Sequence, residues 1–208
     1  MEDVLDVYKR PQDPQRPLVC MDECPKQLIG EVREPVPVEP GQPERFDTEY
    51  QRNGTCEFFM FTAPLEGWRR VEVTERRTQL DWAQQIKRLV DEDFPEALRI
   101  VLVMDNLNTH TPGSLYATFA PAEAKRIWDR LEIHHTPKHG SWLNMAEIEL
   151  SVLNGHGIPD RVPSLEAMRQ EVAAWERERN GSQAGIDWRF TTADARIKLK
   201  RLYPKVVS

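Results

Sequence analysis

Cysteine is scarce in this 208-residue chain, and long apolar runs are missing. The three cysteines, Cys20, Cys24 and Cys56, are an odd number without a secretory leader, which indicates reduced thiols rather than a disulfide framework. No second Cys or His pair stands at zinc-finger spacing from Cys20 and Cys24. No segment approaches the roughly 20 apolar residues that span a bilayer, and the polar start has no signal-peptide core. We therefore expect a cytoplasmic protein with no membrane partner.

A surplus of positive charge is also missing, because the formal net charge is −6. This argues against a protein that binds DNA over its whole surface, since neutralisation of DNA phosphates by basic residues is the main non-specific attraction between protein and DNA. It does not count against a domain that cuts DNA. A metal-dependent nuclease gathers carboxylates, and the bound cations mask their charge. Basic residues cluster only locally, at Arg69–Arg70, Arg76–Arg77, Lys125–Arg126 and Arg196–Arg201.

The hydrophobic patterns predict an α/β fold. Strands are expected at residues 17–22, 55–62, 68–74, 100–104 and 133–136, and helices at 81–91, 121–131, 141–153, 163–179 and from 192 onward. The run Ile100–Met104 is apolar throughout, as in a central strand that helices cover on both faces. We expect a mixed five-stranded sheet flanked by helices, with the first, fourth and fifth strands parallel and adjacent. Chemistry would then sit at the carboxyl ends of these strands.

The rest of the chain gives the domain boundaries. Residues 1–16 read as a charged leader without an apolar period, and we expect them to be poorly ordered. Four prolines between positions 35 and 43 exclude a helix and favour an extended arm over residues 31–53. The prediction is a leader over 1–16, a main domain over 17–180 that includes the arm, and a basic C-terminal helix and tail over 181–208.

Two acids stand where predicted strands end. Asp22 follows the apolar residues Leu18–Met21, and Asp105 follows Ile100–Met104. An Asp in this position often serves only a turn, and the Asn-, Thr- and Pro-rich segment after Asp105 is typical of a loop. Carboxylates at the ends of central strands are equally typical of a binding site. Each acid alone leaves both interpretations open.

The helix predicted over Ser141–Leu153, with Ser141 as its N-cap, carries two candidate glutamates. With residues placed about 100° apart, Glu147 falls at the edge of the apolar arc and Glu149 falls inside it. An edge carboxylate can reach a wet cleft, whereas one inside the arc is buried or faces another segment. Periodicity alone does not choose between them.

A third acid would complete a set suited to phosphodiester hydrolysis. Two divalent ions about 4 Å apart can activate a water and stabilise the leaving oxygen. Mg²⁺ takes oxygen ligands in octahedral array and keeps several waters. Three carboxylates could hold two such ions and leave positions for phosphate and water, with no histidine or cysteine ligand.

Three segments together resemble the bacterial insertion-sequence transposases related to the mariner superfamily. They are LVCMDE from Leu18, IVLVMDNLNTHTP from Ile100 and TPKHGSWLNMAEIELSVL from Thr136, and the resemblance extends to Tyr203. It implies an RNase H-like DDE catalytic domain over residues 17–180 that uses two Mg²⁺ or Mn²⁺ ions. Matching the motifs residue by residue implies that Asp22, Asp105 and, through Leu-Asn-x-x-Glu, Glu147 are the catalytic metal ligands.

The resemblance also implies a reaction and its partners. Transposon ends would be cut by hydrolysis, and a 3′-hydroxyl would then attack target DNA, in this family typically at TA dinucleotides. The implied partners are terminal inverted repeats, target DNA and a second copy of the chain in a homodimer. Asn106, His110, Lys138 and His139 are candidates to contact DNA or to support the three acids, although each could instead serve only its own loop.

Three features depart from the family pattern. A helix-turn-helix region would be expected before the catalytic domain. Gly155, Gly157 and Pro159 predict that the glutamate-bearing helix ends where relatives continue it. Asp105 and Glu147 are 42 positions apart, more than in many relatives. Two alternatives therefore stay open: a truncated, inactive remnant that serves as an interaction or dimerisation module, and an RNase H-like nuclease or integrase of another kind.

Overall fold

The computed structural model describes residues 1–33, 40–42 and 48–203 and is organised around one mixed sheet. The five strands lie in the order β3-β2-β1-β4-β5. They are β1 (Leu18–Glu31), β2 (Tyr50–Ala63), β3 (Trp68–Thr74), β4 (Ile100–Met104) and β5 (Leu131–His135). Strands β1, β2 and β3 pair antiparallel, whereas β4 runs parallel to both β1 and β5. The predicted mixed sheet, with its first, fourth and fifth strands parallel and adjacent, is confirmed.

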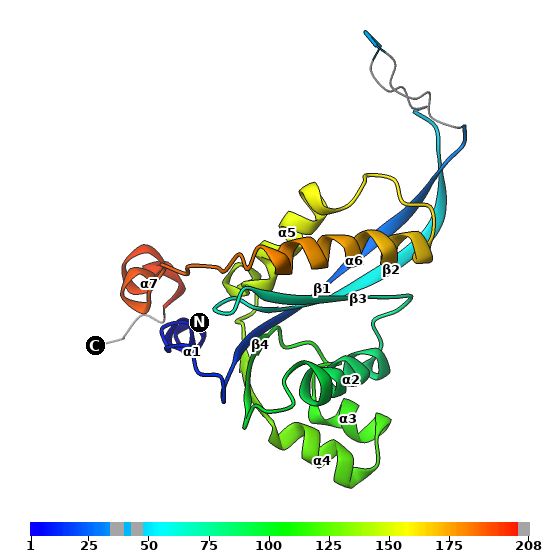
Figure 1. Cartoon of the computed structure of the whole chain (residues 1–208). Coiled ribbons are helices and arrows are strands. Elements are labelled where there is room, and N and C mark those ends of the chain that lie inside the picture. Colours follow the sequence, from blue (N-terminus) through cyan, green and yellow to red (C-terminus); the bar gives the residue numbers. More distant parts are fainter. Residues whose placement is uncertain (34–39, 43–47, 204–208) are drawn as a thin grey trace.

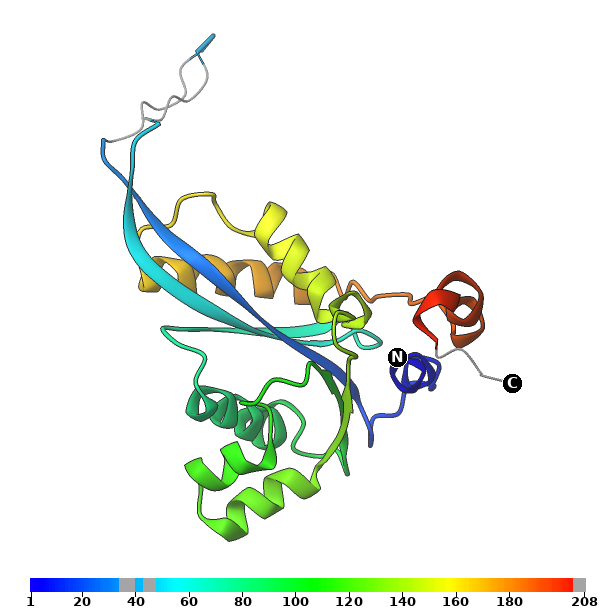
Figure 2. The same ribbon diagram turned by 180° about the vertical axis from the view of Figure 1, so that it is seen from behind.

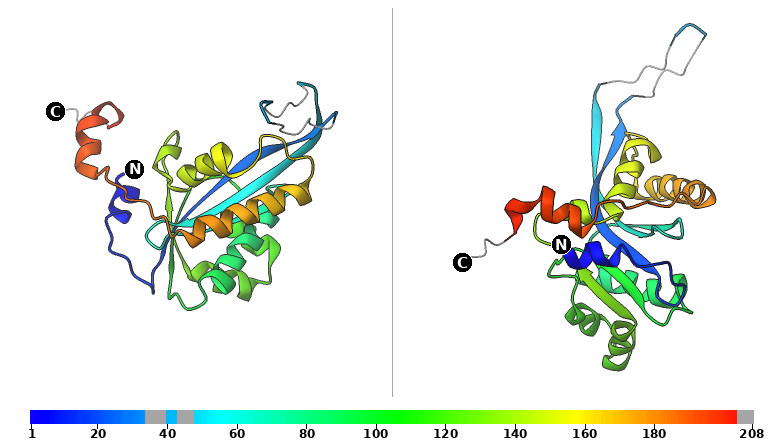
Figure 3. Two further views of the ribbon diagram at one scale, coloured as in Figure 1. Left: turned by 45° about the horizontal axis from the view of Figure 1, so that its top comes forward. Right: turned by 90° about the vertical axis from the view of Figure 1, so that its left-hand side faces the viewer.

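Helices cover both faces of this sheet (Figure 1). One face carries α2 (Gln79–Arg88), α3 (Pro112–Thr118) and α4 (Pro121–Asp129), and the other carries α5 (Ala146–Val152) and α6 (Leu165–Gly181). Helices α1 (Glu2–Val7) and α7 (Thr192–Lys198) pack together at one end of the molecule (Figure 3). Two π-helical turns, Leu89–Asp93 and Leu153–Gly157, extend α2 and α5, and 3₁₀ turns occur at Ser141–Leu143 and Lys200–Leu202. Within the described ranges, no helix is long and apolar enough to cross a membrane.

Side-chain alternation in the central strands divides the core into two layers. Leu18 and Cys20 of β1 belong to the layer under α5 and α6, whereas Val19 and Met21 belong to the layer under α2 and α4. Successive strand residues point to opposite faces, so a short apolar run supplies both layers at once. The continuous run of β4, buried at every position, is explained in the same way.

Strands β1 and β2 are much longer than predicted and form a two-stranded arm that extends beyond the helices (Figure 2). The prediction that the first strand ends at Asp22 is wrong, because β2 continues to pair with β1 as far as Glu31. Pro25 is tolerated inside β1 because β4 pairs only with Leu18–Cys20, which leaves that edge without a strand partner among the described residues. Of the predicted Pro-rich arm over 31–53, residues 34–39 and 43–47 lie outside the described residues.

Residues 1–16 do not form the poorly ordered leader that we expected. Val4, Leu5 and Val7 of α1 are buried in the layer under α5 and α6. Tyr8 donates a hydrogen bond to the carbonyl oxygen of Leu143 at 2.6 Å. The apolar stretch is too short to show a helical period in the sequence, and its burial depends on partners more than 100 residues away.

The remaining differences from the predicted elements lie in short helices. Helix α3 was not predicted, and it begins at Pro112 in the segment that reads as a loop. The basic C-terminal helix begins as predicted, and its Arg196 pairs with Glu2 of α1 at 2.8 Å. Helix α5 gives way to the π turn Leu153–Gly157 and then to extended backbone at Ile158, which confirms the predicted helix end.

Candidate active site

The parallel pairing of β1 with β4 brings Asp22 and Asp105 to one place. The register aligns Cys20 with Val103 at the last paired position, and both side chains lie in the core layer under α5. Two positions further along β1, alternation directs Asp22 toward that same face, and Asp105 directly follows the last residue of the neighbouring β4. Asp22 thus stands inside β1 rather than at its end, but at the point where β1 leaves β4.

Asn144 holds Asp22 from the side of α5. The buried Asn144 amide donates to Asp22 Oδ2 at 3.1 Å and to the Met21 carbonyl oxygen at 2.7 Å. Its Oδ1 accepts from the backbone N–H of Ala146 at 3.2 Å, in the first turn of α5. One side chain therefore joins β1 to the start of this helix. Sequence reasoning missed this role, although the Leu-Asn pair of the motif was its signal.

The same asparagine sets where α5 begins. The predicted helix start at Ser141 is wrong, since Ser141–Leu143 is a 3₁₀ turn without a side-chain cap and Asn144 has extended backbone (φ −84°, ψ 113°). Helix α5 begins only at Ala146, so Glu147 lies in its first turn and is exposed.

The pKa of Asp22 responds to its burial and to the acids around it. Burial and, less strongly, the negative charges of Glu147, Asp105 and Glu23 together raise the pKa of Asp22 to about 7, against the opposing hydrogen bond from the backbone N–H of Glu23. Glu23 N donates to Asp22 Oδ1 at 2.8 Å. The three acids therefore share one neighbourhood, where each disfavours ionisation of Asp22.

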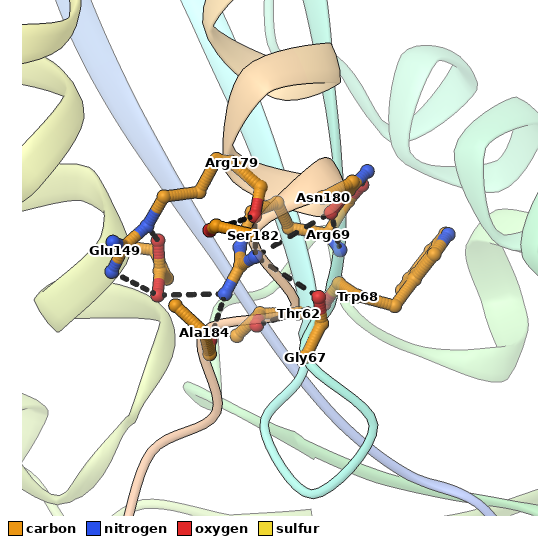
Figure 4. A network of polar contacts seen from close by, with 9 residues as sticks. All are labelled: Thr62, Gly67, Trp68, Arg69, Glu149, Arg179, Asn180, Ser182 and Ala184. Atoms are coloured by element: carbon orange, nitrogen blue, oxygen red, sulfur yellow. Dashed lines mark hydrogen bonds and ion pairs between the residues drawn. The ribbon is translucent and has the colours of Figure 1, made fainter.

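Glu149 points away from this neighbourhood into the protein. Its side chain is fully buried and pairs with Arg69 at 3.1 Å and with Arg179 at 3.1 Å (Figure 4). Arg69 also donates to the carbonyl oxygens of Gly67 and Ala184, so this network joins α5, β3 and the segment after α6. Both oxygens of Glu149 are therefore occupied by arginines. Of the two glutamates that periodicity left open, only Glu147 presents an exposed carboxylate.

His110 holds Asp105 from the other face of the sheet. Its Nδ1 lies 2.8 Å from Asp105 Oδ1, and its Nε2 lies 3.0 Å from Glu23 Oε1. The ring stacks on Trp82, with centroids 5.4 Å apart. Burial would lower the pKa of His110, but the carboxylates of Asp105 and Glu23 outweigh burial and raise it to about 9. A charged imidazolium thus bridges two acids.

Glu23 is the second residue of this site that sequence reasoning missed. Its side chain is buried, and among the described residues Glu23 Oε2 has no hydrogen-bond partner. The only signal in the sequence was its place directly after Asp22. Asn106, Lys138 and His139, by contrast, were predicted candidates, and they line one hollow together with Asp105.

The donor set suits a hard divalent cation. Carboxylate oxygens are the ligands that Mg²⁺ and Mn²⁺ prefer, and a cation would stabilise the ionised form of Asp22, which burial and the neighbouring acids disfavour. Across residues 1–33, 40–42 and 48–203, however, no three Asp, Glu, His or Cys side chains already stand together as a metal-binding group. The chemistry of the residues fits such an ion, whereas a preformed cage is absent from this part of the chain.

Comparison with known proteins places this geometry in a family. The profile of the family described as DDE superfamily endonuclease matches residues 17–169. The solved Mos1 mariner paired-end complex with Mn has a TM-score of 0.58 at 19% identity, covering 87% of this chain and 55% of that one. A pre-cleavage Mos1 transpososome has a TM-score of 0.53 at 19% identity, covering 89% and 60%. None of the curated proteins compared with the chain matches it.

The likeness to these structures concerns the fold. At 19% identity it shows that the mixed sheet with its covering helices is RNase H-like, as in Mos1. The chain spans 55% to 60% of the length of the Mos1 chains in these two structures.

Proposed function

The chain belongs to the DDE superfamily endonucleases, and from that premise we propose that it is the catalytic domain of a transposase. It would cut DNA phosphodiesters at transposon ends and transfer the freed strand to target DNA. The observation that carries the proposal is how the fold gathers Asp22, Asp105 and Glu147: β1 pairs with β4 just before the two aspartates, and Asn144 links Asp22 to the first turn of α5, which carries Glu147. These three residues take the catalytic and metal-binding roles in the proposal.

The names of the similar structures support the proposed partners. One is a Mos1 paired-end complex with Mn, one contains the left transposon end, and one is a strand transfer complex. For this chain we propose terminal inverted repeats and target DNA as partners, two Mg²⁺ or Mn²⁺ ions as cofactors, and a homodimer as the active form. The motifs quoted above support an insertion-sequence element of bacterial type as its source.

In this proposal the chain's own residues prepare the site. When bound, two divalent ions supply charge stabilisation for the attacking and leaving oxygens. Asn144 keeps Asp22 facing α5, and His110 keeps Asp105 in place from the opposite side. Glu147 reaches the site from the first turn of α5. Asn106, Lys138 and His139 would contact the DNA beside Asp105.

The test is metal-dependent cleavage of a duplex that carries the element's terminal repeat. We expect strand breaks with Mg²⁺ or Mn²⁺ for the unaltered chain, and at least a hundredfold less product for Asp22→Asn, Asp105→Asn or Glu147→Gln. Glu171→Gln, at an exposed position of α6, is the matched control and should retain full activity. A thermal shift with Mn²⁺ that Asp105→Asn abolishes would report metal binding apart from catalysis.

Two outcomes would contradict the proposal. Equal product from the unaltered chain and from Asp105→Asn would show that the three acids do not carry the cleavage. A folded chain that shows neither cleavage nor a Mn²⁺-dependent thermal shift would favour an inactive interaction module.

A further inference from the structure

The hydroxyl of Tyr8 contacts the turn from which α5 starts. Tyr8 directly follows α1 and is 8% exposed, and its Oη donates to the Leu143 carbonyl oxygen at 2.6 Å. The same hydroxyl oxygen lies 3.6 Å from Cys20 Sγ in β1. Leu143 and Cys20 are fully buried, so both contacts lie in the core. One phenol group thus joins α1, β1 and the turn before α5.

The carbonyl group that Tyr8 binds belongs to the last residue of the 3₁₀ turn Ser141–Leu143. The last carbonyl groups of a helical turn have no partner within that turn, and a buried carbonyl without a donor is costly. Tyr8 supplies the donor for Leu143. Without the hydroxyl, the turn can restore a partner only by moving, and the next residue along the chain is Asn144.

Burial keeps this hydroxyl protonated. Burial and the neighbouring Cys20 thiol raise the pKa of Tyr8 above its ordinary value of 10, although a hydrogen bond with the backbone of Met145 opposes them. The phenol therefore remains a donor to Leu143 at neutral pH. Leu143 and Met145 flank Asn144, so the hydroxyl of Tyr8 acts on the backbone on both sides of this asparagine.

The C-terminal part of the chain holds Tyr8 and its helix in place. The edge of one ring meets the other where Tyr8 contacts Trp188, with ring centroids 5.2 Å apart. Thr192 Oγ1 donates to Asp6 Oδ1 at 2.7 Å, which fastens α7 to α1 (Figure 3). The position of the hydroxyl is therefore fixed from both ends of the described chain.

We propose that Tyr8 is a positioning residue of the active site, which acts through Asn144 on the carboxylate of Asp22. The inference rests on the proposed function, in which Asp22 is a metal ligand. The Asn144 amide donates to Asp22 Oδ2 at 3.1 Å, so a shift of the turn moves this donor away from the carboxylate. Helix α1 thereby supports the site, although it contributes no residue to the three acids.

The test removes one oxygen atom with Tyr8→Phe. In metal-free full-length chain, amide NMR spectra report the side-chain amide of Asn144, whose signals are assigned by their loss in Asn144→Ala. We expect Tyr8→Phe to displace these signals. In a Mn²⁺ titration, Tyr8→Phe should weaken affinity about tenfold, the lower end of what loss of a supporting contact costs a metal site. In an Asn144→Ala background, Tyr8→Phe should weaken Mn²⁺ affinity no further, because the two changes act through one contact.

Two controls separate positioning from general stability. Val73→Ala removes buried apolar surface from β3 in the same core layer, so it should lower the thermal midpoint and leave Mn²⁺ affinity unchanged. Tyr50→Phe removes a hydroxyl group on the exposed arm, which accepts a hydrogen bond from Arg52, and should also leave Mn²⁺ affinity unchanged.

Two results would overturn the inference. One is that the Asn144 amide signals of Tyr8→Phe coincide with those of the unaltered chain. The other is that Tyr8→Phe weakens Mn²⁺ affinity by the same factor with and without Asn144. Failure of the proposed function would look different: the unaltered chain would show neither Mn²⁺ binding nor cleavage, while the NMR comparison would still decide whether Tyr8 positions Asn144.

Discussion

Arg69 and Glu149 form an ion pair with a 3.1 Å contact in which both side chains are fully buried. This pair fixes the rotation of α5, because Glu149 must face the protein interior to meet Arg69. Residues two positions apart on a helix point about 200° from each other. Glu147 is therefore turned away from Arg69 and is exposed. In the proposed site, this ion pair orients the helix face that carries Glu147.

Replacement of Glu149 should damage stability, whereas replacement of Glu147 should damage activity. Glu149→Gln leaves the Arg69 charge buried without its carboxylate, and we expect a loss of about 3 kcal/mol in the free energy of unfolding. Glu147→Gln changes an exposed side chain, so we expect it to alter the free energy of unfolding by no more than about 0.5 kcal/mol. Urea denaturation of both variants measures the difference. Comparable stability of the two variants would show that the Arg69–Glu149 pair does not hold α5.

Asn144→Ala should impair both the site and the start of α5. It removes the donors to Asp22 Oδ2 and to the Met21 carbonyl oxygen, and it removes the acceptor of Ala146 N–H. We expect a loss of about 2 kcal/mol in stability and about ten- to hundredfold in Mn²⁺ affinity, measured by titration. Asn53→Ala also removes one hydrogen bond to a backbone carbonyl, that of Pro163, and should leave Mn²⁺ affinity unchanged. Unaltered Mn²⁺ affinity in Asn144→Ala would refute its role in placing Asp22.

His110 and Glu23 should prove energetically coupled. His110→Gln leaves buried Glu23 without the imidazolium, whereas the same change in a Glu23→Gln background leaves no carboxylate behind. A double-mutant cycle from urea denaturation should therefore give a coupling of about 1–3 kcal/mol. The control cycle combines His110→Gln with Glu171→Gln on α6. In this cycle the two losses in the free energy of unfolding should be additive. Additivity in the His110–Glu23 cycle as well would mean that their 3.0 Å contact contributes nothing measurable.

Glu132 should stabilise the N-terminal segment in a pH-dependent way. Burial opposes its ionisation, but Arg10, Arg16 and His134 outweigh burial and lower the pKa of Glu132 from its ordinary value of 4.5 to about 2. A depressed folded-state pKa contributes stability that is present above pH 4.5 and is lost as the pH falls toward 2. Glu132→Gln should therefore cost about 1 kcal/mol at pH 7, given the solvent-exposed arginines.

The measurement is the free energy of unfolding of the unaltered chain and of Glu132→Gln as a function of pH. The gap in unfolding free energy between the unaltered chain and Glu132→Gln should narrow between pH 4.5 and 2. For the exposed Glu171→Gln, the gap should stay near zero at every pH. A Glu132→Gln gap that is constant down to pH 2 would contradict the proposed pairing.

Local pattern was sufficient for much of the fold. The apolar run Ile100–Met104 predicts β4 with its observed bounds, and the alternation in Trp68–Thr74 predicts β3. Such patterns arise from residues within a single strand or helix, and hydrophobic periodicity detects patterns of this kind. The same reading failed for α1, whose few apolar residues form a helix only because the layer under α5 and α6 buries them.

At the candidate site, the kinds of residue and the family can be recognised from the amino-acid sequence alone. Asp22, Asp105 and the Leu-Asn-x-x-Glu motif are visible in the chain, and the match over residues 17–169 shows that it belongs to the family of DDE superfamily endonucleases. The folded chain alone shows that Glu147 is the exposed glutamate, that Asn144 binds Asp22 and that His110 contacts Glu23. These contacts join residues that lie far apart in the chain. Arg69 and Glu149 are 80 residues apart, and Asn144 and Asp22 are 122 apart, so no local pattern encodes these contacts.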